Sequence, residues 1–205
     1  SGIGNRLGKF VLASGLIWTI LACLAQGVIK DGIGLWGPTM IQDIYGVDAG
    51  TASFLLLFIP VMNFMGITLV GMIQRKRLLE EEMLVVIMMV LSVFILASLR
   101  VFMGKSLTAG VLLLGGVSAV MYGVNTILLG VFPLRFARAN RASFVSGLLD
   151  FCSYVAAGLS SVFSGLVIQL GLGWNSVFLV WMALTVMGIG ALGVFGWKYK
   201  AQTGR

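Results

Sequence analysis

Long apolar runs, separated by short polar segments, make up most of this 205-residue chain. The runs are continuous and do not alternate apolar and polar residues, which is typical of membrane helices and not of barrel strands. A spanning helix needs about 20 residues. We therefore expect an all-α membrane protein with six transmembrane helices, over residues 11–43, 51–73, 83–103, 107–133, 143–170 and 175–197. Residues 1–10 are then the end of a linker, 11–197 the six-helix domain and 198–205 a tail.

Three positions predict irregularities within these spans. The first span is longer than a bilayer requires, and we expect an interruption after Lys30, where a stretch containing Gly32, Gly34, Gly37 and Pro38 begins. Pro60 predicts a kink in the second span, and Pro133 predicts the end of the fourth.

Polar residues are distributed among the spans in a repeated order. The first and second spans contain internal polar groups and the third is uniformly apolar, and the same order returns in the fourth, fifth and sixth. A repeat of three helices reverses its orientation in the membrane, so this order predicts two inverted three-helix repeats. The apolar third and sixth spans should face lipid.

The composition supports a membrane protein and excludes several kinds of chemistry. Hydrophobic residues form 59% of the chain and charged residues 10%, against about 25% in soluble domains. The chain has no histidine, and its two cysteines, Cys23 and Cys152, lie inside apolar spans, where they are typical packing residues. No pair of catalytic carboxylates, nucleophile with a base, or metal-ligand cluster is present. We therefore expect no enzyme, no cofactor and no metal site.

The basic residues predict the orientation of the chain. Of 14 lysines and arginines, 11 fall on one side of the predicted membrane and only Arg100 and Lys105 fall on the other, with Lys30 inside a span. Because positive loops stay in the cytoplasm, both termini should be cytoplasmic, in a plasma membrane. The net charge of +7 thus reflects topology and does not indicate a nucleic-acid partner; the expected surroundings are a lipid bilayer.

Lys30 is the first candidate functional residue. On a helix, Thr19, Cys23, Gln26 and Lys30 share one narrow stripe. A charge inside an apolar segment is costly unless it faces protein or a water-filled cavity, so it indicates a functional site. The alternative is that the helix ends near Lys30, whose side chain then extends to the headgroups. The match of residues 32–37 to a dinucleotide-binding pattern is rejected because it follows an apolar helix and not a strand.

The fourth and fifth spans supply further candidates. Asp150 and Tyr154 lie on the small, polar face of the fifth span, and Tyr122 and Asn125 share a face of the fourth. A mid-membrane Asp costs about 2.5–3.5 kcal/mol, which favours a functional role, but Asp150 could also be a buried ion-pair partner of Lys30. Tyr122 and Asn125 could donate to a substrate or bond a neighbouring helix.

The stretch Lys30–Thr39, K-D-G-I-G-L-W-G-P-T, resembles the seventh helix of the organophosphate:phosphate antiporters of the major facilitator superfamily, which include the glycerol phosphate and hexose phosphate transporters. Residues 147–154, followed by Gly173, Trp174 and Phe178, look like the eleventh helix of that family and the turn into the twelfth. The loop at 75–77 lies where the charged loop between helices 8 and 9 would be. The resemblance covers nearly the whole chain, as helices 7–12.

This resemblance implies the C-terminal half of a transporter, whose partner is an N-terminal six-helix half. It implies secondary active transport, by antiport or symport, of a small organic anion such as a sugar phosphate or sugar acid. Lys30 takes the position of the phosphate-binding arginine of the family, although a lysine cannot form the bidentate fork of an arginine. The expected substrate-binding residues are Lys30, Gln26, Tyr122, Asn125, Asp150 and Tyr154.

Two other classes of function remain open. A membrane sensor or receptor on the same fold would bind a ligand without transporting it, and a membrane scaffold would bind none. Within the transport hypothesis, close pairing of Asp150 with Lys30 would make anion uptake depend on protonation of Asp150. A distant Asp150 would leave Lys30 as a simple anion clamp.

Overall fold

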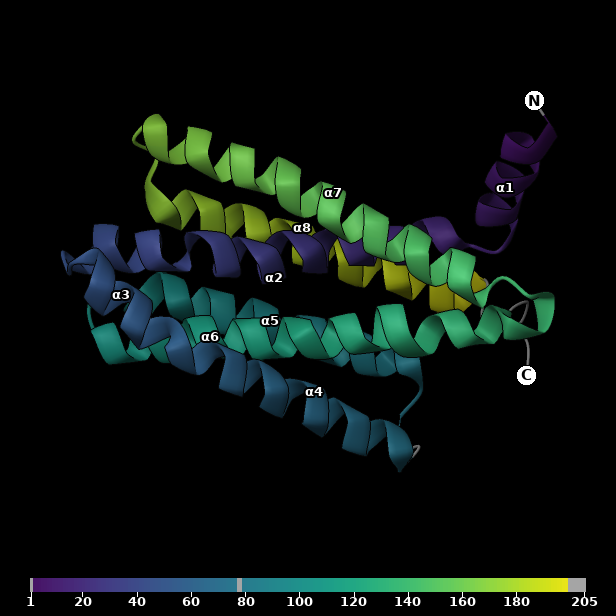
Figure 1. Cartoon of the computed structure of the whole chain (residues 1–205), viewed down its shortest axis with the longest axis horizontal. Helices are drawn as coiled ribbons and strands as arrows, with labels where there is room; N and C mark the ends of the chain where they lie inside the picture. Colours follow the sequence, from purple (N-terminus) through teal and green to yellow (C-terminus); the bar gives the residue numbers. More distant parts are fainter. Residues whose placement is uncertain (1, 77–78, 199–205) are drawn as a thin grey trace.

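The computed structural model describes residues 2–76 and 79–198, and its regular elements within these ranges are all helical (Figure 1). Six helical segments in this part of the chain are long and apolar enough to cross a membrane, which confirms the all-α membrane fold. The α-helices are α1 (Gly2–Ala13), α2 (Leu16–Tyr45), α3 (Ala49–Leu55), α4 (Ile59–Arg75), α5 (Glu81–Phe102), α6 (Leu107–Asn125), α7 (Ala142–Gln169) and α8 (Gly173–Lys198).

Helix α2 runs without interruption from Leu16 to Tyr45, so the break predicted after Lys30 is wrong. The first span instead breaks earlier, at Gly15, which adopts a left-handed conformation with φ of 72° between α1 and α2. Two of the glycines after Lys30, Gly32 and Gly37, lie at close contacts with other helices, whereas Gly34 is exposed and faces open space. A Cβ added at Gly32 would lie 2.7 Å from the Trp181 ring of α8, so the missing side chain makes room for this indole.

Prolines affect the second and fourth spans differently. A 3-10 turn, η1 (Leu56–Phe58), separates α3 from α4, and Pro60 occupies the first turn of α4, where no N–H donor is needed. The irregularity of this span is thus the 3-10 turn before α4, and a kink at Pro60 stays a prediction. Pro133 does not end the fourth span, because it begins a new 3-10 segment, η3 (Phe132–Ala139), after a π-helical stretch, η2 (Thr126–Val131). The helical segment therefore continues to Ala139.

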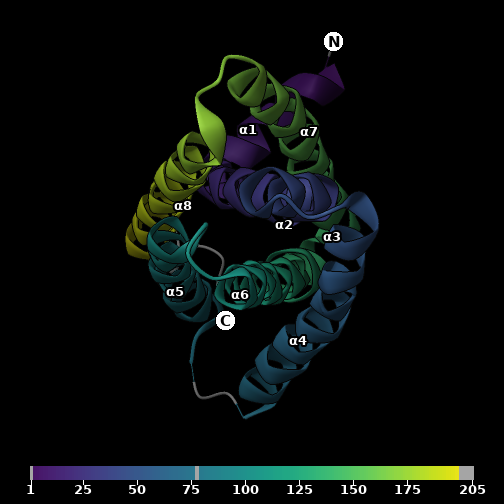
Figure 2. The ribbon, with the colours of Figure 1, turned by 90° about the vertical axis from the view of Figure 1, so that its left-hand side faces the viewer.

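The packing of the helices repeats in the two halves of the chain. Helix α2 packs against α7 and α8, and α6 packs correspondingly against α4 and α5; α2 also contacts α6, and α5 contacts α8 (Figure 2). Exchanging α2, α4 and α5 for α6, α7 and α8 reproduces these contacts, and α7 additionally contacts α8. Helices α2 and α6 run in opposite directions (Figure 1). This is the arrangement of two inverted three-helix repeats that the order of polar spans predicts.

Polar bonds at the two ends of the bundle follow the same symmetry. At one end, Trp174 Nε1 donates to Asp43 Oδ2 at 2.9 Å, which joins the start of α8 to the end of α2. At the other end, the Arg135 guanidinium pairs with Glu82 and Glu81, which joins the segment after α6 to the start of α5. Asp43 and Arg135 are 92 positions apart, and so are Glu82 and Trp174. The two bonds therefore join equivalent positions of the repeats.

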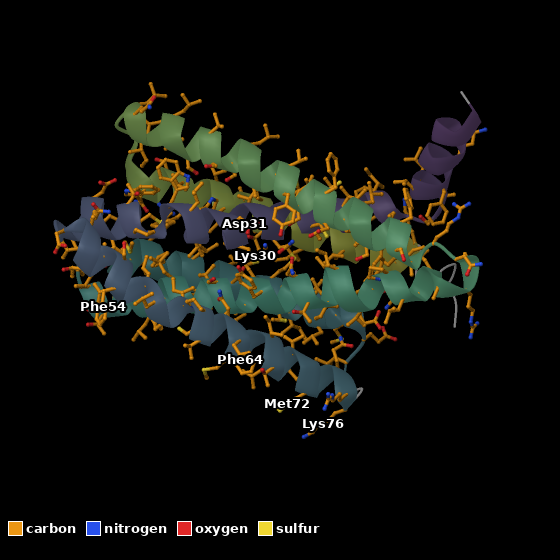
Figure 3. All side chains as sticks on the ribbon, viewed as in Figure 1. Lys30, Asp31, Phe54, Phe64, Met72 and Lys76 are labelled. Carbon is orange, nitrogen blue, oxygen red and sulfur yellow. The ribbon has the colours of Figure 1, made fainter. Side chains whose placement is uncertain are left out.

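The two sides of the bundle differ in what covers them. Helices α5 and α8 lie on one side of the central pair α2 and α6, and α4 and α7 lie on the other (Figure 2). The segment Ala49–Arg75 is the least buried of the six, with 17% of its most apolar window inside the protein. Its exposed side chains Phe54, Phe64 and Met72 point away from the bundle (Figure 3). The side formed by α4 and α7 thus presents apolar surface without a partner within the described chain.

Candidate functional site

Lys30 lies at the midpoint of α2, with 14 helical residues before it and 15 after it. At about 1.5 Å per residue, each end of the helix is about 20 Å away, beyond the reach of a lysine side chain. The residue is 7% exposed and is enclosed by α2 itself, α6 and α7. The alternative in which the helix ends near Lys30 and the side chain reaches the headgroups is therefore wrong.

Three groups surround the Lys30 ammonium. Its Nζ lies 2.8 Å from Asp31 Oδ1, and it stands 5.3 Å from the ring centre of Tyr122 on α6 and 5.4 Å from that of Tyr154 on α7. Rings at this distance attract a cation through their negative faces. The structure therefore brings together three of the residues selected from the sequence, and adds Asp31, which was not selected.

Lys30 and Tyr122 are themselves 92 positions apart, so they occupy equivalent places in the two repeats. Equivalent residues that touch each other lie on or near the axis that relates the repeats. In inverted-repeat transporters, that axis runs in the plane of the membrane, and substrates bind near the midplane. The position of the cation thus follows from the symmetry of the fold as well as from the length of α2. Figure 3 places Lys30 and Asp31 near the middle of the bundle.

Asp31 is the direct neighbour of Lys30, and adjacent residues on a helix do not face each other. The long lysine side chain bends around the helix to reach the carboxylate. Asp31 keeps 28% of its side chain exposed, yet its second oxygen, Oδ2, is buried and has no hydrogen-bond partner in the described chain. Asp31 is therefore only half satisfied by Lys30. The Lys-Asp dipeptide within an apolar run was the available sequence signal.

Gln26 has a packing contact of its own. It is fully buried, and its Nε2 donates to Ser153 Oγ of α7 at 2.8 Å. Beside it, a Cβ added at Gly27 would lie 2.5 Å from both the carbonyl oxygen and the hydroxyl oxygen of Ser153. The backbones of α2 and α7 thus cross closely here, and the structure places Gln26 within this crossing, with its Nε2 bonded to Ser153 and its Oε1 buried without a partner in the described chain.

Asp150 and Asn125 are half-buried, and neither forms a hydrogen bond or ion pair with any other described residue. Asp150 lies one turn before Tyr154 on α7, and its charge acts on Cys23 of α2, two turns before Lys30. The ion pair between Asp150 and Lys30, one alternative from the sequence, is therefore not formed, and Lys30 pairs with Asp31 instead. Asn125 shares the face of Tyr122 without a direct contact to Lys30 among the described interactions.

The wide turn after Asn125 has a specific partner on α7. In the π-helical stretch η2, the carbonyl oxygen of Leu129 accepts a hydrogen bond from Ser146 Oγ at 2.9 Å. Such stretches are frequent at functional sites because they displace side chains from the regular helical register. This feature was not expected from the sequence, since neither glycine nor proline marks its start.

Cys23 and Cys152 are both free thiols, as expected for packing residues. Across the described ranges, no group of three or more cysteine, aspartate or glutamate side chains is placed to hold a metal ion. The chemistry available at the midplane is therefore that of one cation, its carboxylate neighbour and two phenol rings.

Comparison with known proteins returns no relative: no protein-family model matches the chain, and neither the curated proteins nor the solved structures contain a match.

Proposed function

We propose that this chain is the C-terminal six-helix half of a transporter of the major facilitator type and that it moves a small organic anion by alternating access. The observation that carries the proposal is the buried ammonium of Lys30 at the midpoint of α2, between Tyr122 and Tyr154. A cation kept inside the membrane is costly, and a site for an anion justifies that cost. The inverted repeats supply the scaffold on which such sites occur.

The proposal also assigns an occupant to the apolar side formed by α4 and α7. In alternating access, two halves rock against each other around a site between them, so one half must present a surface to the other. Helix α4 and the exposed face of α7, including Phe151 and Leu159, form such a surface next to Tyr154. An N-terminal six-helix half would cover it and close the substrate cavity over Lys30.

A transport assay tests the function directly. The complete polypeptide, in lipid vesicles, should take up at least one labelled anion from a set of glycerol 3-phosphate, gluconate and lactate, and should bind the same anion in detergent. Binding without uptake would support a sensor or receptor instead. Neither binding nor uptake for any anion would indicate a membrane scaffold and would contradict the proposal.

The orientation of the chain gives a second test. The ends of α4 and α8 lie at the same end of the bundle as the N-terminus, opposite the turn between α5 and α6 (Figure 1). Because basic residues cluster at that first end, we propose that it is cytoplasmic. In a background without Cys23 and Cys152, a cysteine at position 105 should react with an impermeant maleimide added to intact cells, and a cysteine at position 76 should not. Both positions are exposed in the structure, so labelling in the reverse pattern would contradict the assignment.

A further inference from the structure

We propose that Asp31 is a proton-controlled latch on Lys30, so that the site takes up one monoanion together with one proton. This inference rests on the proposed function and assigns it a mode of coupling and a class of substrate. It starts from the ion pair between Lys30 Nζ and Asp31 Oδ1, 2.8 Å apart, in the middle of a membrane helix.

The positive charge of the Lys30 ammonium is already paired with a carboxylate. Asp31 takes one of its three N–H donors, and the rings of Tyr122 and Tyr154 flank it at 5.3 and 5.4 Å. The side chain of Lys30 is otherwise enclosed, with 7% exposed. An arriving anion must therefore compete with the Asp31 carboxylate for the same charge.

The net charge of the site decides how that competition ends. Lysine and aspartate together carry no net charge, which suits a region of low dielectric constant. Adding a monoanion alone would leave the group of three with a charge of minus one, and a buried uncompensated charge is strongly unfavourable. Adding one proton to Asp31 restores neutrality: the carboxylate becomes a carboxylic acid, its ion pair with Lys30 is lost, and the ammonium pairs with the substrate.

Asp31 is suited to receive that proton. Its Oδ2 is buried and without a hydrogen-bond partner in the described chain, so it can accept a proton without the loss of an existing hydrogen bond. At the same time, 28% of the Asp31 side chain is exposed, so the residue lies at the edge of the enclosed site.

Other titratable groups near the pair are few. Helix α6 contributes the phenol of Tyr122, and α7 contributes that of Tyr154 and, one turn away, the carboxyl of Asp150. Helix α8 presents Trp181, which does not titrate, beside Gly32. Asp150 is the only rival carboxyl among these facing groups, and it has no ion pair with Lys30.

The mechanism restricts the substrate and the driving force. One proton neutralises one negative charge, so a monoanion such as a monocarboxylate or a sugar acid fits, whereas a phosphate dianion would leave an uncompensated charge. Transport is then electroneutral symport. A pH gradient should drive accumulation, and an imposed membrane potential should not.

The test measures binding of acetate, lactate and gluconate to the complete polypeptide at several pH values. Each probe keeps its single charge between about pH 6 and 8. Because binding takes up one proton, the affinity of the wild type should fall about tenfold per pH unit as the pH rises. Asp31→Asn should bind equally at all these pH values, and in vesicles it should exchange the anion without accumulating it along a pH gradient.

Asp43→Asn is the matched control, with the same substitution on the same helix. The new side-chain oxygen can still accept the bond from Trp174, so the tenfold dependence of affinity on pH should remain.

A wild-type pH dependence in Asp31→Asn would overturn the latch. Loss of the pH dependence in Asp150→Asn alone would also overturn it. Binding of glycerol 3-phosphate but of none of the three monoanions would overturn the latch and leave the transport proposal standing. If Lys30→Ala abolishes binding but Asp31→Asn keeps the affinity and pH dependence of the wild type, the latch is likewise overturned and the transport proposal stands. If the complete polypeptide binds none of these anions, both the latch and the transport proposal are rejected.

Discussion

Alanine at position 30 should weaken anion binding by the complete transporter at least about 30-fold, since loss of one partner of a buried charged contact costs about 2–5 kcal/mol. In this chain, Lys30 is the one buried cation at the midpoint of a membrane helix within the described ranges. Binding measured by calorimetry or by thermal stabilisation with the transported anion would give the change directly.

Two companion variants separate loss of binding from loss of folding. Lys30→Arg keeps the positive charge and should retain binding within about tenfold of the wild type, because the charge carries most of the interaction. Lys30→Ala alone leaves the Asp31 carboxylate unpaired. The double variant, Lys30→Ala with Asp31→Asn, also removes that carboxylate, so the double variant should fold normally and still fail to bind the anion. Unchanged affinity in either alanine variant would reject the assignment of Lys30 as the anion site.

Valine at position 27 should destabilise the bundle by about 2–4 kcal/mol. Overpacking a close contact costs about 1–3 kcal/mol, and loss of a buried hydrogen bond adds about 1 kcal/mol. The added side chain would collide with the backbone of Ser153, where α2 and α7 cross, and would separate Gln26 from the Ser153 hydroxyl. The free energy of unfolding of the complete polypeptide in mixed micelles, followed by circular dichroism, measures this loss.

Gly190→Val provides the comparison. Gly190 is exposed on α8, and no atom lies within 4 Å of a Cβ added there. The same glycine-to-valine change should shift the stability by less than about 1 kcal/mol. Equal effects of the two substitutions would show that the close crossing at Gly27 contributes no special stability.

Proline and glycine illustrate where local sequence signals succeed and fail. Pro60 predicts a kink, and the structure has a 3-10 turn at Leu56–Phe58, which leaves Pro60 in the first turn of α4, where its missing N–H donor is not needed. Gly32 and Gly37 also look like breaks, yet α2 passes through them. Their missing side chains leave space for Trp181 and Leu56, residues distant in the sequence. A glycine signal has two meanings, and only the neighbouring helices decide between them.

The choice of a partner for Lys30 shows the same limit within the site. Asp150 was a candidate because of its cost in the membrane, with an ion pair to Lys30 as the alternative, and Asp31 was not among the expected substrate-binding residues. Adjacent residues on a helix do not face each other, yet the flexible lysine side chain overcomes that geometry and reaches Asp31 at 2.8 Å. Helical periodicity gives the direction in which the Cβ of a residue points. The four methylene groups of a lysine allow its Nζ to reach a group on another face of the helix.

The sequence by itself determined the membrane class, the number of spanning helices and the order of the two repeats, because these depend on the length and polarity of continuous segments. It also selected Lys30, Tyr122 and Tyr154, since polar groups inside apolar segments are conspicuous without any structure. Only the tertiary structure decided that these three meet near the axis between the repeats, that Gln26 is committed to Ser153, and that Asp31 holds the cation. Those contacts join different helices or depend on side-chain conformation, and both are settled by packing, which a one-dimensional pattern of polarity does not contain.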